Sequence, residues 1–173
     1  PTQWRESFLL TYTLRVGESL EIELKTENTG ESAFIINQAL HSYYAVANIE
    51  DILVSGFENA QYIDKTVNEE SASKIQKGKI NFSAETDAVF ENSPGPYTII
   101  DPNYKRKIRI ESENSNSAVV WNPWIKKGKA INLAENEYKN MLCVENCNIF
   151  SDTVKIKAKE SHTLKVKITL ENS

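Results

Sequence analysis

Apolar and polar residues alternate with a period of two near both ends of the chain. Every second residue from Phe8 to Val16 is apolar, and the same alternation runs from Leu20 to Leu24. This period is typical of a strand with one buried face. Because Gly17-Glu18 separates the two segments, we predict an antiparallel hairpin with its polar residues facing solvent. A third strand is expected from Ala33 to Ile36.

The C-terminal segment repeats this alternation, with lysines at most of the polar positions. Positions 154–158 and 164–170 alternate on either side of Glu160-Ser161, which predicts a second hairpin. The lysine stripe has two interpretations: an anion-binding face, or, as we favour, the solvated face of an edge hairpin, where lysine discourages edge-to-edge pairing.

Shorter strands and turns fill the middle of the chain. The strand candidates are Asp51–Val54, Lys79–Phe82, Tyr97–Ile100, Arg106–Ile110 and Ala118–Trp121. A short helical turn near Ala134–Asn140 is the one helical candidate. Many short strands separated by turns predict an all-β sandwich, formed by residues 1–173 as a single domain.

Charge and composition exclude several classes of partner. Twenty Lys and Arg against 24 Asp and Glu give a net charge of −4, which is too close to neutral for a nucleic-acid or anionic-membrane binder. No apolar run reaches the ~20 residues of a membrane span, and the N-terminal segment PTQWRESFLL lacks the basic flank and apolar core of a signal peptide. We therefore expect a soluble, cytoplasmic protein. Cys143 and Cys147 lack the spacing of a zinc or redox pair, so we expect buried or free thiols in a reducing compartment.

Few residues have the chemistry of a catalyst. Two histidines are too few for a His-rich metal site, and the glycine-rich phosphate loop, the G-x-S-x-G elbow and the H-E-x-x-H motif are absent. His162 lies in a polar turn. His41 lies among apolar and aromatic residues that should bury it in part, and it could be catalytic or a core residue. Glu145 ends an apolar run, where an unpaired buried carboxylate would be costly.

The segment Trp121-Asn122-Pro123-Trp124 places two large aromatic residues on either side of a turn. Such residues can stack on a sugar ring, and they can equally form a corner of the core. From the residues alone, both interpretations stay open.

Five blocks together carry a family resemblance. They are Ala-Leu-His-Ser-Tyr-Tyr (39–44), Gly56 through Tyr-Ile-Asp-Lys (62–65), Glu-Thr-Asp-Ala-Val-Phe (85–90), Val-Val-Trp-Asn-Pro-Trp (119–124) and Met-Leu-Cys-Val-Glu (141–145). In this order and approximate spacing, the chain resembles the glucose-6-phosphate 1-epimerases, which are hexose-6-phosphate mutarotases of the aldose 1-epimerase superfamily. The resemblance covers essentially the whole chain.

The resemblance implies a galactose-mutarotase-like antiparallel β-supersandwich that interconverts the α and β anomers of a hexose 6-phosphate without a metal or organic cofactor. It implies that Glu145 is the general base at the anomeric hydroxyl, that His41 is the general acid at the ring oxygen, and that Asp87 binds sugar hydroxyls. We add Trp121, Asn122 and Trp124 as further candidates for sugar binding.

These residue types suit the reaction independently of the family. Opening a hemiacetal removes a proton from O1 while another reaches the ring oxygen, so an acid and a base must flank one carbon. The ordinary pKa values of Glu and His, about 4.3 and 6.5, must approach each other, and burial of Glu145 would raise its pKa in that direction.

The chain departs from the family pattern in two respects. Ala88 and Phe90 stand where an arginine and a tyrosine are common. Family members also carry a long portion before the strand that begins near Trp4, including arginines that hold the 6-phosphate. We therefore expect this chain to be the C-terminal part of such a protein, without the phosphate site and with an exposed sheet edge that could self-associate.

Two alternatives to a mutarotase stay open. The first is a non-catalytic carbohydrate-binding β-sandwich that uses Asp87, Trp121 and Trp124. The second is a β-sandwich interaction domain in which His41 and Glu145 are structural and line no concave site. A pure binding module needs no paired acid and base, so the relative position of these two side chains separates the hypotheses.

Overall fold

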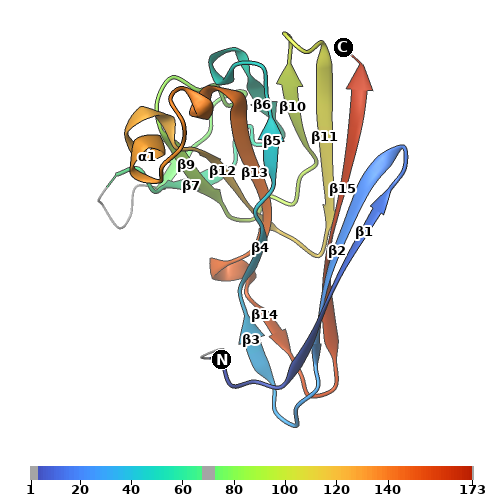
Figure 1. The fold of residues 1–173 in the computed structure, drawn as a ribbon. Coiled ribbons are helices and arrows are strands. Elements are labelled where there is room, and N and C mark those ends of the chain that lie inside the picture. Colours follow the sequence, from blue (N-terminus) through green and yellow to red (C-terminus); the bar gives the residue numbers. More distant parts are fainter. Residues whose placement is uncertain (1–3, 68–72, 173) are drawn as a thin grey trace.

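The computed structural model describes residues 4–67 and 73–172, which form mainly antiparallel strands in two facing layers (Figure 1). The first layer is a six-stranded sheet with the order β1-β2-β15-β11-β10-β6. Its strands are β1 (Phe8–Val16), β2 (Ser19–Asn28), β6 (Leu53–Ser55), β10 (Tyr97–Asp101), β11 (Arg106–Glu113) and β15 (Ser161–Asn172). The predicted all-β class is confirmed.

The second layer is a seven-stranded sheet with the order β4-β13-β12-β9-β7-β8, in which β5 also pairs with β13. Its strands are β4 (Gln38–Leu40), β5 (Tyr43–Ala45), β7 (Gln61–Asp64), β8 (Ser73–Ile75), β9 (Thr86–Phe90), β12 (Ser117–Asn122) and β13 (Met141–Asn148). A separate two-stranded sheet joins β3 (Phe34–Ile36) to β14 (Val154–Ile156).

Helical structure is short. The helix α1 (Trp124–Ala130) has seven residues and follows β12. Three 3₁₀ turns cover Ile49–Asp51, Glu137–Asn140 and Phe150–Asp152. The predicted helical turn near 134–140 corresponds to the second of these turns. The helix α1 was not predicted from the sequence, because its seven residues are too few to establish a helical period.

One hydrophobic core fills the space between the two layers. Ile110 and Leu164 of the first sheet face Phe90, Val120 and Leu142 of the second, and all five are fully buried. Because side chains alternate along each strand, the intervening residues of the second sheet point away from this core. That opposite face carries His41 and Glu145.

The two ends of the chain differ in how well the sequence predicted them. The N-terminal hairpin is confirmed, with Phe8 opposite Asn28 and Val16 opposite Leu20. The prediction of a C-terminal hairpin is wrong, because β14 pairs with β3, and β15 is an inner strand between β2 and β11. The β15 lysines therefore do not protect an edge, and Lys165 pairs instead with Glu113 at 3.0 Å. The segment Lys79–Phe82 forms only one bridge, between Ile80 and Val54.

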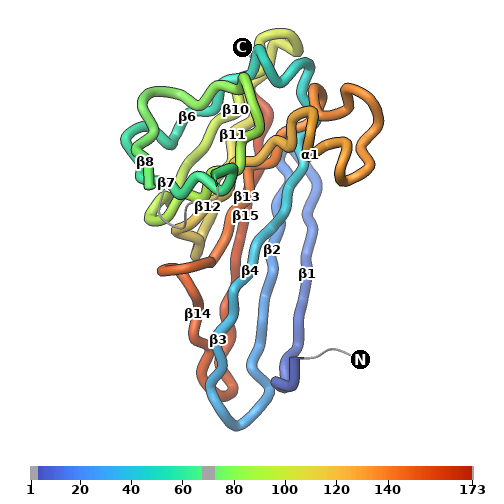
Figure 2. The backbone as a smooth tube through the Cα atoms, turned by 90° about the vertical axis from the view of Figure 1, so that its left-hand side faces the viewer, coloured from blue at the N-terminus to red at the C-terminus, as the bar shows by residue number. Residues whose placement is uncertain are grey.

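The strand β1 is an uncovered edge of the first sheet (Figure 2). Among the described strands it pairs only with β2, and the β1–β2 turn extends away from the second sheet (Figure 1). Leu10, Tyr12 and Leu14 are each more than half exposed, although they lie on the same face as the buried Ile22. The apolar face that the sequence predicts is real, but the described residues leave it open to solvent.

Candidate functional site

The candidate site is built on β13, an inner strand of the second sheet. Leu142 and Val144 point into the core, whereas Cys143, Glu145 and Cys147 share the opposite face. Both cysteines are buried and free, as predicted. Their neighbour Glu145 is the one charged residue on a strand that is otherwise apolar or neutral.

His41 lies opposite Glu145 in the strand register. Leu40 pairs with Asn146 and Tyr43 pairs with Cys143, so the same register continued across the short gap between β4 and β5 sets His41 against Glu145. Residues directly opposite each other in an antiparallel pair place their side chains on one face, within contact distance. The strand pairing therefore brings together the two residues on which the functional prediction depends.

The side chains of the pair are in contact. His41 Nε2 lies 3.4 Å from Glu145 Oε1. The imidazole stacks on Tyr43, with ring centroids 4.7 Å apart and planes inclined by 13°, and its centroid lies 5.9 Å from that of Trp121. The His41 side chain is 49% exposed and that of Glu145 only 9%, so His41 is more exposed than its apolar surroundings predict. One partner is accessible and the other is nearly desolvated.

Burial changes the acidity of the groups on this face. It raises the pKa of Glu145 from its ordinary 4.5 to about 7, with a further contribution from the negative charge of Asp87. Burial and the neighbouring Glu145 also raise the pKa of the Cys143 thiol, which keeps that sulfur protonated. The direction predicted for Glu145 is confirmed, and it is the direction that a proton-transfer group near neutral pH requires.

Asp87 and Trp121 lie on the same face as the pair. Trp121 of β12 is opposite Asp87 of β9 on one side and Cys143 of β13 on the other. Lys127 of α1 reaches over this end of the sheet, and its Nζ lies 3.7 Å from carboxylate oxygens of both Asp87 and Glu85. Tyr43 and Lys127 were not among the predicted site residues, although Tyr43 stands in the same sequence block as His41.

The structure places the other two proposed sugar-binding residues elsewhere. Asn122 is fully buried, and its amide donates to the carbonyls of Tyr138 and Met141 while its oxygen accepts from the Trp124 backbone N–H. Trp124 packs on Tyr138, with ring centroids 5.1 Å apart, and against the core. Both expectations are corrected: this segment forms a corner that holds β12, α1 and β13 together.

The surface around the pair is open. A hollow of about 290 Å³ borders Asp87 and continues toward Tyr62 and Asp64 of β7. His41 and Glu145 do not line this hollow, and the imidazole faces solvent directly. This is the one feature of the described residues that agrees with the interaction-domain alternative.

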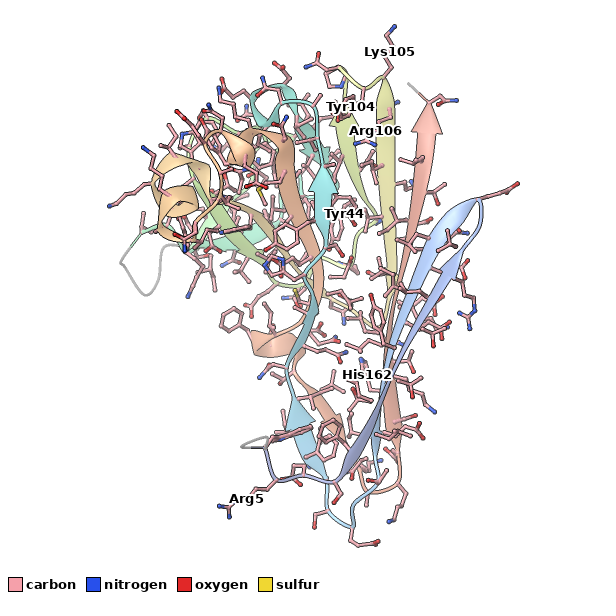
Figure 3. The ribbon with its side chains drawn as sticks, in the orientation of Figure 1. Arg5, Tyr44, Tyr104, Lys105, Arg106 and His162 are labelled. Carbon is pink, nitrogen blue, oxygen red and sulfur yellow. The ribbon has the colours of Figure 1, made fainter. Side chains whose placement is uncertain are left out.

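The arginines lie away from the pair or have partners of their own. Arg5 points away from the body of the molecule, at the opposite end from Arg106 (Figure 3). Arg15 and Arg109 pair with Glu23 and Glu111. Arg106 donates to the Ala45 carbonyl and covers the Tyr104 ring.

Comparison with known proteins identifies the family. A model of the family described as "Aldose 1-epimerase" matches residues 3–169. The chain belongs to the aldose 1-epimerase family. The resemblance carried by the five sequence blocks is confirmed.

Curated relatives within this family share about a third of their residues with the chain. A protein of Cenchrus ciliaris, named "Putative glucose-6-phosphate 1-epimerase", is 35% identical over 147 residues, which cover 82% of this chain and 44% of the relative. A protein of Escherichia coli with the same name is 33% identical over 165 residues, covering 92% and 52% respectively. This chain of the aldose 1-epimerase family thus spans about half the length of the curated relatives it matches.

Solved structures agree on the fold. A crystal structure of a "putative mutarotase" from Salmonella typhimurium superposes with a TM-score of 0.86 at 26% identity. The superposition covers 99% of this chain and 56% of the Salmonella chain. A second, titled as a "Putative aldose 1-epimerase" from Escherichia coli, has a TM-score of 0.77 at 12% identity and covers 100% and 63%. The predicted galactose-mutarotase-like fold class is confirmed. Within residues 4–67 and 73–172, no helix has the length and hydrophobicity to span a membrane.

Proposed function

We propose that this aldose 1-epimerase family member provides the acid–base pair of a hexose-6-phosphate mutarotase. The observation that carries the proposal is the contact between the accessible imidazole of His41 and the desolvated carboxylate of Glu145, 3.4 Å apart. The names of the curated relatives support the choice of substrate class.

Glu145 is the base of the proposed reaction. Its carboxylate takes the proton of the anomeric hydroxyl, O1 becomes a carbonyl oxygen, and the bond between C1 and the ring oxygen breaks. Because its pKa is raised to about 7, Glu145 is a stronger base than an ordinary carboxylate and still loses its proton near neutral pH. Burial supplies this property, since water does not stabilise the ionised form.

His41 is the acid of the same step. Its Nε2 proton passes to the ring oxygen, which leaves as the C5 hydroxyl. After the aldehyde rotates by half a turn about C1–C2, the hydroxyl attacks the opposite face, His41 recovers its proton and Glu145 returns a proton to O1. Stacking on Tyr43 holds the imidazole over the open surface where a sugar would bind. No proton is gained or lost over the cycle.

Asp87 and Trp121 bind the sugar in this proposal. Trp121 lies between Asp87 and Cys143 in the strand register, so its indole borders the surface beside the pair. Aromatic faces pack on the apolar side of a pyranose, and a carboxylate accepts hydrogen bonds from hydroxyls. The carbohydrate-binding alternative uses the same two residues, but it gives no role to the contact between His41 and Glu145.

We expect this chain to bind the 6-phosphate group of the sugar only weakly. Arg15 and Arg109 are paired with glutamates, and Arg106 is held by the Ala45 carbonyl. Bidentate guanidinium contacts are among the strongest that a protein makes to phosphate. We therefore expect the 173-residue chain to bind glucose 6-phosphate and glucose with affinities that differ by less than tenfold, about 1.4 kcal/mol.

Anomer exchange, followed by nuclear magnetic resonance of the two anomeric protons, tests the proposal. Glu145→Gln and His41→Asn should each reduce the exchange rate by roughly 10²–10⁴-fold, because each removes one proton-transfer partner. Exchange is measured with both glucose and glucose 6-phosphate, so the substrate expectation is tested in the same samples.

Matched variants away from the pair control for nonspecific effects. Glu113→Gln removes a carboxylate from the exposed end of β11, and His162→Asn removes the second histidine, on β15 (Figure 3). Both should exchange anomers at the unaltered rate. Full exchange in folded Glu145→Gln would contradict the base assignment, and a preference of tenfold or more for the phosphorylated sugar would show that a phosphate site survives in these residues.

A further inference from the structure

Cys143 lies beside the pair and has no role in the proposed reaction. Its sulfur, a ligand atom of His41 and a carboxylate oxygen of Glu145 all lie within 4.8 Å of one another. The three residues come from facing positions: His41 is opposite Glu145 in the register, and Cys143 is two residues earlier on β13. Imidazole nitrogen, thiolate sulfur and carboxylate oxygen are the three ligand types that Zn²⁺ takes in proteins.

We infer that His41, Cys143 and Glu145 form a binding site for a thiophilic divalent cation of the Zn²⁺ class, and that the bound cation inhibits proton transfer. The cation is an inhibitor here and takes no part in the reaction, because it occupies both the acid and the base. Binding itself is independent of the proposed function, whereas inhibition rests on it.

The distances suit tetrahedral coordination after a small adjustment. Zinc–ligand bonds of about 2.0–2.3 Å place neighbouring ligand atoms roughly 3.3–3.8 Å apart. The separation of 3.4 Å between His41 and Glu145 already lies in this range, and the sulfur must approach by up to about 1 Å. His41 can make much of this movement, since its side chain is half-exposed. The solvent side of the imidazole leaves a fourth position open for water.

Glu145 supplies a buried carboxylate to the proposed site. Glu145 is nine-tenths buried, and within the described ranges 4–67 and 73–172 its recorded ion-pair partner is His41 alone. A cation would replace that single contact with direct coordination. The bound ion must displace the thiol proton of Cys143, which is released to solvent, and this competition favours soft cations over Mg²⁺ or Ca²⁺, which prefer oxygen ligands.

Cobalt provides a spectroscopic test that needs no enzyme activity. Co²⁺ titrated into the 173-residue chain should give the near-ultraviolet absorption of a thiolate–cobalt bond and the visible bands of a tetrahedral site, and Zn²⁺ should remove both. Cys143→Ala should abolish the thiolate band and weaken binding at least tenfold. Cys147→Ala, the matched control on the same strand and face, should change affinity by less than twofold.

His41→Gln provides a second test if Cys143→Ala fails to fold, because the His41 side chain is half-exposed and its loss leaves no core cavity. It should weaken Co²⁺ binding at least tenfold while circular dichroism stays unchanged. Absence of the thiolate band in the unmodified chain, or its loss in Cys147→Ala, would overturn the inference. A thiolate band without Zn²⁺ inhibition of anomer exchange would support the site and contradict its inhibitory role.

Discussion

The strands β1 and β13 invert the usual relation between sequence and burial. β1 alternates large apolar residues, yet all but one of its nine positions are exposed. β13 contains Glu145 and two asparagines, yet seven of its eight positions are buried. The difference lies in their neighbours within the described part of the chain: β13 has β12 on one side and β4 and β5 on the other, whereas β1 has only β2. What packs on a strand, and not its own pattern, decides whether a residue is desolvated.

This comparison also separates stability from function. On β13, burial gives a carboxylate a raised pKa beside an imidazole. On β1, the apolar side chains of Leu10, Tyr12 and Leu14 remain more than half exposed. We expect substitutions on the two strands to differ in sign and size.

The largest expected difference concerns two leucines. Leu142→Ala on β13 removes a fully buried side chain from the core, which should lower the free energy of unfolding by about 2–5 kcal/mol. Leu14→Ala on β1 removes a side chain that is 53% exposed, and it should change the free energy of unfolding by less than about 0.5 kcal/mol. Urea denaturation of both variants measures the difference. Equal losses would show that β1 is covered in solution.

The second prediction concerns Glu145→Gln and pH. The folded chain holds the Glu145 proton more tightly than the unfolded chain, since its pKa is about 7 instead of 4.5. The stability from this proton is complete below pH 4.5 and is lost as the pH rises through 7. Glutamine carries no charge, so the variant should become more stable than the unmodified chain by about 1–3 kcal/mol at pH 8.

Thermal or urea unfolding at several pH values checks this prediction. The advantage of Glu145→Gln should vanish below pH 4.5, where the Glu145 carboxyl group is protonated in both the folded and the unfolded chain. Glu113→Gln, which changes an exposed carboxylate, should show no comparable gain at pH 8. A Glu145→Gln variant that is less stable than the unmodified chain at pH 8 would mean that the carboxylate stabilises the fold.

Tyr12→Lys should have the smallest effect on the free energy of unfolding. It should instead reduce self-association of the chain. A long apolar edge strand can pair with a second copy, and lysine on that edge opposes such pairing. We expect sedimentation velocity to show concentration-dependent association of the unmodified chain and at least tenfold weaker association of Tyr12→Lys, with unfolding unchanged. Ile75→Lys, at an exposed apolar position on β8, is the control and should associate normally. An unmodified chain that stays monomeric would contradict the expectation.

The local alternation of apolar and polar residues was sufficient to predict the pairing of some strands and insufficient for others. The β1–β2 hairpin was predictable because Gly17-Glu18 joins two alternating segments that pair with each other. The same reasoning failed for β14 and β15, because β14 pairs with β3, more than a hundred residues earlier. Alternation predicts that a segment is a strand but does not specify its partner.

The sequence was sufficient to predict which residues form the candidate site, but not how their side chains are arranged. Family resemblance singled out His41 and Glu145, but their contact depends on the pairing of β4 and β5 with β13, which no local signal carries. The two tryptophans on either side of the Asn122-Pro123 turn could not be placed from the sequence for the same reason. Asn122 and Trp124 are held by Tyr138 and Met141 across the corner, while Trp121 alone reaches the face of the pair.

The most direct test of this account is the titration of the Glu145 carboxyl carbon in a ¹³C-labelled chain, with the resonance assigned by its absence in Glu145→Gln. The account predicts a pKa near 7, well above the ordinary value of 4.5, because β13 desolvates the carboxylate beside His41. A carboxyl group that titrates near pH 4.5 would show that the site is hydrated, and it would contradict the claim that burial prepares Glu145 as a base.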